Sequence, residues 1–189
     1  MEILRRNNHP TKSVVLVSRH RILLEGLRAM AKECRSLKTI AAFQDYEEAI
    51  EFINKGGSDW IIIDGDFKYE SVHLLRSLRF KNHTSKFLVI TWHPDLSHVL
   101  RWVRAGAHAV LDKRESNSAL AVALERVDSG HLYLPKPIRE RILRSIGETP
   151  QLEEPFLFLT EQAKAFAQTL AYKEAPMLKA TGPPTRTSS

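Results

Sequence analysis

Short apolar runs alternate with segments of helical spacing along residues 13–134. The runs, rich in β-branched and aromatic residues, are Val14–Val17, Thr39–Phe43, Trp60–Ile63, Phe87–Ile90 and Ala109–Leu111. Unbroken apolar runs of this length are typical of strands that are covered on both faces, as in a parallel sheet.

Between the runs, apolar residues recur three or four positions apart. These stripes cover Ile22–Met30, Ala49–Ile53, Leu74–Leu78, Val99–Val103 and Leu120–Val127. Such spacing predicts helices with one buried face. Five strands alternating with five helices predict an α/β fold, a doubly wound, five-stranded parallel sheet with right-handed crossovers.

The pattern changes after Leu134, so we predict a first domain over residues 13–135. Residues 136–155 are interpreted as a short basic helix, Ile138–Ile146, followed by a polar linker. Residues 156–189 are interpreted as one helix at Phe156–Tyr172, with Thr160 as its cap, and a polar, proline-rich end that is typical of disorder.

Composition narrows the class of protein. The chain of 189 residues has one cysteine, Cys34, which excludes an internal disulfide and a cysteine zinc cluster. It has no apolar run near the roughly 20 residues that span a bilayer and no visible secretory signal, so we expect a cytoplasmic protein without membrane contact. The net charge of +6 favours polyanions, but the basic residues are dispersed and are interpreted mainly as solvated helix faces.

Three polar residues follow predicted strands. Asp64, Thr91 and Lys113 come at or just after the ends of the third, fourth and fifth apolar runs. Functional groups of a doubly wound sheet gather at the carboxyl ends of its strands. A carboxylate, a hydroxyl and an ammonium in one place could accept and hold a phosphoryl group, although Asp64 could also simply cap a loop.

Three segments resemble the receiver domains of LuxR-type (nitrate-response) response regulators. These are Val15–Leu27, Ala105–Lys113 and Gly130–Pro135, which match the first strand and helix, the fifth-strand motif and the exit from the domain. The resemblance covers about 120 residues and implies the flavodoxin-like receiver fold with a short helical C-terminal extension. It also implies that Asp64 is the phospho-acceptor position, Thr91 the switch hydroxyl and Lys113 the lysine of the family pattern.

The acidic pair that such receivers carry after the first strand is replaced by Ser18 and Arg19. Serine and arginine cannot supply the anionic ligands that Mg²⁺ requires, so we expect no cofactor and no metal site. We hypothesise that Arg19 and Lys113 pair with Asp64 and stand in for the metal.

Three further positions depart from the family pattern. Trp92 replaces the small residue after the switch hydroxyl, and Val110 occupies the usual aromatic switch position. Asp66 lies in an unusual loop after Asp64. It could supply a metal ligand from the other side, but the interpretation we favour is a solvated turn residue.

The C-terminal segment is short for a DNA-binding domain. Leu159–Ala171 resembles the opening helix of the family's helix-turn-helix domain, but Pro176 halts the start of a second helix, and the segment carries balanced charge. Major-groove recognition needs a full helix supported by phosphate-binding cations. A truncated helix-turn-helix is therefore predicted, which does not favour direct DNA binding.

The sequence thus predicts a pseudo-receiver, not an enzyme, that acts in signal transduction and transcriptional regulation through protein–protein contacts without phosphorylation. Its partner would be another response regulator or a second copy, and a sensor kinase is left open. Candidate surfaces are the first and fifth helices, or a fourth-helix face with Leu100, Trp102 and Val103, unless Trp102 packs inward. The alternative is a phosphorylated two-component transcription factor that binds DNA.

Overall fold

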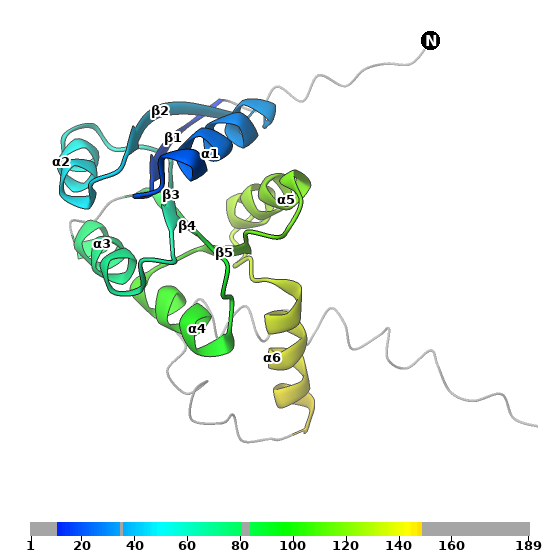
Figure 1. Cartoon of the computed structure of the whole chain (residues 1–189). Helices are drawn as coiled ribbons and strands as arrows, with labels where there is room; N and C mark the ends of the chain where they lie inside the picture. The colour runs from blue at the N-terminus through cyan, green and yellow to red at the C-terminus, as the bar shows by residue number, and fades with distance from the viewer. Residues whose placement is uncertain (1–10, 35, 81–83, 149–189) are drawn as a thin grey trace, which may run out of the picture.

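The computed structural model describes residues 11–34, 36–80 and 84–148, and all five predicted strands lie within them. The strands form one parallel sheet in the order β2-β1-β3-β4-β5 (Figure 1). Their bounds are β1 Lys12–Val17, β2 Leu37–Phe43, β3 Trp60–Asp64, β4 Lys86–Thr91 and β5 Ala109–Asp112. The predicted α/β class and doubly wound sheet are confirmed.

Helices cover both faces of the sheet (Figure 1). One face carries α1 and α5, and the other carries α2, α3 and α4. Alternate strand residues divide between the two cores: Val14 and Leu16 pack beneath α1, while Val15 and Val17 face the other layer. The helices are α1 Arg21–Glu33, α2 Tyr46–Gly56, α3 Lys68–Phe80, α4 Leu96–Ala105 and α5 Asn117–Asp128.

Local sequence sets where several helices begin and end. The Asp45 carboxylate accepts the backbone N–H groups of Glu47 and Glu48 at the start of α2, and Asp95 accepts that of His98 at the start of α4. These contacts satisfy donors that a helix leaves free at its first turn. At the end of α4, Gly106 has a φ of 111°, which favours glycine.

A sixth helix, α6 (Lys136–Glu148), follows Leu134. It begins two residues earlier than expected, because Pro137 lies in the first turn, where a missing N–H costs little. Ile138 and Ile142 are 5% and 2% exposed and belong to the core cluster that also contains residues of α2, α3 and α4. The predicted helix at Phe156–Tyr172 and its Thr160 cap lie outside the described residues.

Within the described ranges, none of the helices has the length and apolar character needed to span a bilayer.

Candidate functional site

The carboxyl ends of three strands bring the predicted polar residues together. Asp64 is the last residue of β3, Thr91 the last of β4, and Lys113 follows β5. Backbone hydrogen bonds hold the ends in register, from the Gly65 N–H to the Ile90 carbonyl and from the Lys113 N–H to the Thr91 carbonyl, both 2.8 Å. The sheet therefore aims all three side chains at one small volume.

Asp64 is fully buried, and both of its carboxylate oxygens are engaged. Oδ1 accepts the Lys113 ammonium at 2.8 Å and the Asp66 N–H at 3.2 Å. Oδ2 accepts the Ser18 hydroxyl at 2.7 Å, and the Nδ1 atom of His20 lies 3.4 Å from it. The carboxylate is thus held in place by partners from three segments, the loops that follow β1, β3 and β5.

Asp66 is a second member of the site, and its interpretation as a solvated turn residue is wrong. Its Oδ2 accepts the Lys113 ammonium at 2.6 Å. Its Oδ1 accepts the Thr91 hydroxyl at 2.6 Å and the Trp92 N–H at 3.0 Å. Lys113 therefore bridges two carboxylates, and its side chain is only 5% exposed.

These contacts change the protonation of Asp66. Burial raises the pKa of Asp66, but hydrogen bonds from Lys113, Thr91 and the Trp92 backbone together lower it by a larger amount. The pKa therefore lies below its ordinary value. Asp66 is accordingly a carboxylate at neutral pH.

The hypothesis that Arg19 pairs with Asp64 is wrong in part. The Arg19 guanidinium lies 2.9 Å from Glu70 on α3 and over the rings of Tyr46 and Phe67, each at 5.6 Å. The residue that reaches Asp64 from this segment is Ser18. Arg19 turns away because the Asp64 oxygens are occupied and Glu70 offers an ion pair nearer the solvent.

His20 was not predicted as a member of the site. Its ring lies beside that of Phe67, with the centroids 5.0 Å apart, and faces Asp64. The sequence signal that could have pointed to it is its place in the same β1–α1 loop as Ser18 and Arg19.

Trp92 covers part of the site from outside. Its side chain is 52% exposed, and the Lys113 Nζ atom lies 5.9 Å from the centre of its ring, within the range of a cation–π contact. This arrangement agrees with the expectation that Trp92, a large residue, lies beside the acceptor position Asp64.

The proposed fourth-helix interface is wrong. Leu100, Trp102 and Val103 are 4%, 2% and 3% exposed and belong to the core. The Trp102 indole N–H donates to the Ser71 hydroxyl at 3.3 Å, so the inward alternative holds. The amphipathic pattern of α4 marks its buried face, because this helix packs on a sheet that is covered on both sides.

The same tryptophan approaches the site loop closely. A Cβ atom on Gly65 would lie 2.6 Å from Val89 Cγ1 and 2.8 Å from Trp102 Cζ2. Glycine is therefore required for the loop that carries Asp66 to pass over the core.

The residues of the site do not match the needs of Mg²⁺. That ion prefers a near-octahedral set of oxygen ligands with free lone pairs and anionic charge. Here the oxygens of Asp64 and Asp66 already accept hydrogen bonds, and the Lys113 ammonium lies between the two carboxylates. Ser18 is neutral and Arg19 points elsewhere, and the described residues contain no cluster of three or more potential metal ligands of the His, Cys, Asp and Glu types.

Comparison with known families decides the class of the domain. The sequence model of one protein family, the response regulator receiver domain, matches residues 14–125, which is more than half of the chain. The chain belongs to the response regulator receiver family. The resemblance seen in the sequence is thereby confirmed.

Relatives of this receiver include whole regulators. It is 26% identical over 132 residues to the transcriptional regulatory protein DegU of Brevibacillus brevis, a match that covers 69% of this chain and 56% of DegU. It is 22% identical over 151 residues to the response regulator UvrY of Escherichia coli K12, covering 79% of this chain and 69% of UvrY. The chain thus aligns with only part of the length of these proteins.

Among solved structures, a two-component response regulator of the LuxR family from Aurantimonas sp. SI85-9A1 aligns with a TM-score of 0.66. The two chains are 22% identical, and the alignment covers 72% of this receiver and 99% of that chain. At this identity the likeness supports the fold, which the two share.

Proposed function

We propose that this receiver is an atypical response regulator, a pseudo-receiver that takes part in signal transduction and transcriptional regulation through protein–protein contacts and does not depend on phosphorylation of Asp64. It would use no Mg²⁺ and catalyse no reaction of its own. A cytoplasmic location is part of the proposal.

One observation carries the proposal: Lys113 is held between Asp64 and Asp66, while Ser18 occupies the remaining oxygen of Asp64. Phosphoryl transfer to a carboxylate needs an oxygen that the phosphodonor can reach, and Asp64 is fully buried. It also needs a cation to offset the charge that develops on the phosphoryl group. In this site the available cation is already neutralised by two carboxylates. The site therefore favours a fixed, self-satisfied state.

The likeness to DegU and UvrY supports a regulatory role, because both are named as regulators. Because the predicted face of α4 with Leu100, Trp102 and Val103 is buried, the predicted surfaces that remain for a partner are those of the first and fifth helices. Ile22 on α1 is 87% exposed and Val122 on α5 is 45% exposed. We infer that the partner is a related regulator or a second copy of this chain.

Incubation of the full chain with acetyl phosphate and Mg²⁺, followed by intact-protein mass spectrometry, tests the proposal. We expect no added phosphoryl mass, while a receiver with an intact acidic pair is labelled in parallel. The matched control is Asp64→Asn. Labelling of the wild type that disappears in this variant would overturn the proposal.

Labelling of the wild type at Asp64 would favour the alternative, a phosphorylated two-component transcription factor that binds DNA. The observation in its favour is that Asp64, Thr91 and Lys113 lie together at the strand ends. It further predicts DNA affinity that falls steeply with salt, measurable by fluorescence anisotropy.

A further inference from the structure

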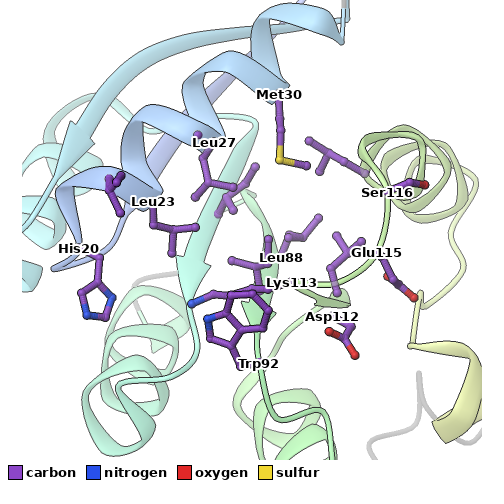
Figure 2. A pocket seen from close by; sticks show the side chains of 16 residues that line it. His20, Leu23, Leu27, Met30, Leu88, Trp92, Asp112, Lys113, Glu115 and Ser116 are labelled. Atoms are coloured by element: carbon purple, nitrogen blue, oxygen red, sulfur yellow. The ribbon is translucent and has the colours of Figure 1, made fainter.

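A cavity of about 360 Å³ lies on the face of the sheet that carries α1 and α5 (Figure 2). Helix α1 packs mainly on β2 and β1, and α5 packs on β5. These strands stand toward the two edges of the sheet, so the middle of the face over β3 and β4 lies between the two helices. Ile62, Leu88 and Ile90 line the cavity from these central strands.

The inner wall of the cavity is apolar. Leu23, Leu27 and Met30 enter from α1, with Leu88 from the sheet opposite them (Figure 2). A volume of this size is at the lower end of the range of small-molecule sites, and such sites are mostly lined by apolar groups. Cavities lined by aliphatic side chains are poorly hydrated and accept apolar molecules.

Gly26 is an exposed residue of α1 at the edge of the cavity. It lies in the interior of α1 and lines the cavity, yet no atom lies within 4 Å of the place where its Cβ would stand. Glycine in a helix interior costs about 1 kcal/mol relative to alanine. The space beside Gly26 is open, so a side chain introduced there would extend toward the cavity.

Two of the charged groups at the mouth are engaged with other protein groups, whereas Glu115 also lines the cavity and its Oε2 atom has no hydrogen-bond partner among the described residues. Lys113 pairs with Asp64 and Asp66, and Asp112 pairs with Arg114. The inner wall itself offers a ligand apolar contacts. Trp92 and His20 also line the cavity, and the Trp92 ring lies beside Lys113, so the cavity and the polar site share three side chains.

We propose that this cavity binds a neutral, apolar small molecule, and that contact of this molecule with Trp92 and Lys113 makes its binding the input signal of the receiver. The role as input rests on the proposed function, because a receiver without phosphorylation needs another signal. The binding site itself rests on the size and the apolar lining of the cavity.

The test uses the neutral fluorescent probe N-phenyl-1-naphthylamine, titrated into the full chain at a concentration where sedimentation gives a monomer. We expect saturable binding at one site. In Gly26→Leu, the added side chain fills the cavity mouth and weakens binding by about tenfold or more. Leu23→Trp is a second filling variant, should the first fail to fold.

Gly56→Leu is the matched control, because Gly56 is also a helical glycine with no atom near its Cβ position and does not line the cavity. We expect it to bind the probe as the wild type does. Methyl and lysine NMR signals of Leu23, Met30 and Lys113 should shift with the same midpoint as the fluorescence.

Probe binding that is unchanged in both filling variants overturns the site, and so does binding that appears only in a dimer. Shifts confined to Leu23 and Met30 overturn the link to the polar site. None of these measurements uses a phosphodonor. Failure of the cavity site would therefore not contradict the proposed pseudo-receiver. Labelling of Asp64 would contradict the pseudo-receiver but would not change the result of the binding test.

Discussion

At the scale of single residues, the site depends on one ammonium shared by two carboxylates. Lys113 is nearly buried, and its ammonium donates hydrogen bonds to the carboxylates of both Asp64 and Asp66. Two carboxylates this close repel each other, and the repulsion is offset by the cation between them. The polar partners from Ser18 and Thr91 complete the network.

Removal of the ammonium should therefore be costly. We expect Lys113→Met to lower the free energy of unfolding by about 3–5 kcal/mol, because it leaves buried charge without a partner. Urea denaturation at pH 7 measures this loss. Lys136→Met, at an exposed lysine of α6, is the control and should change stability by less than about 0.5 kcal/mol. Equal effects of the two variants would contradict the network.

The depressed pKa of Asp66 makes stability depend on pH in the acid range. Its stabilising effect is fully present above the ordinary aspartate pKa of about 3.9 and is lost as pH falls through the lower pKa of the folded state. We expect Asp66→Asn to be less stable than the wild type at pH 7 and to show a shallower loss of stability below about pH 4. Parallel curves for the two proteins, measured by denaturation at a series of pH values, would refute the assignment.

Gly65 offers a test of the close approach between the site loop and the core. We expect Gly65→Ala to cost about 1–3 kcal/mol, because its methyl group would overlap with Val89 and Trp102. Gly56→Ala, in the open, should instead stabilise α2 slightly. Thermal melts of both variants make the comparison, and a neutral Gly65→Ala would show that the loop can move away.

At the scale of elements, helix caps hold the segments that frame the site. Asp95 begins α4 by accepting the His98 N–H at 3.0 Å. Burial raises its pKa, but the hydrogen bonds from His98 and Ser97 together outweigh this effect and lower the pKa to about 2. Ser116 stands at the same position of α5, yet its side chain makes no capping hydrogen bond.

The two caps should therefore respond differently to substitution. We expect Asp95→Ala to cost about 1 kcal/mol at pH 7, and Ser116→Ala to cost less than half of that. The pKa of Asp95 is lower in the folded state, so its contribution should persist above about pH 4 and fade as pH falls toward 2. Chemical denaturation at pH 7 and pH 3 measures both effects, and similar losses in the two variants would contradict the capping geometry.

At the scale of the whole molecule, α6 continues the receiver instead of standing apart from it. Ile138 and Ile142 belong to the same buried core cluster as residues of α4 and the sheet. The division of the chain at residue 135 stays a prediction, but this packing indicates that α6 folds together with the preceding domain.

Truncation of the α6 contact tests that coupling. We expect Ile142→Ala to lower the free energy of unfolding by about 2–5 kcal/mol in a single transition, because the side chain is buried in the shared core. Glu140→Ala, on the exposed side of the same helix, should change it by less than about 0.5 kcal/mol. A separate early transition of α6, seen by circular dichroism, would show that the helix is independent.

The strands, the helices and the meeting of Asp64, Thr91 and Lys113 could be predicted from the sequence, because apolar period and strand ends are local properties. Because the carboxyl ends of parallel strands meet at one edge of the sheet, the fold class alone predicts that these three residues lie together. The tertiary structure alone decided which partner each polar group found: Arg19 turned to Glu70, Asp66 entered the site, and Trp102 turned inward. Side-chain pairing depends on distances between loops and on competition for the same oxygens, and an amphipathic stripe does not say whether it faces a core or a partner. Those are properties of packing, which local sequence does not encode.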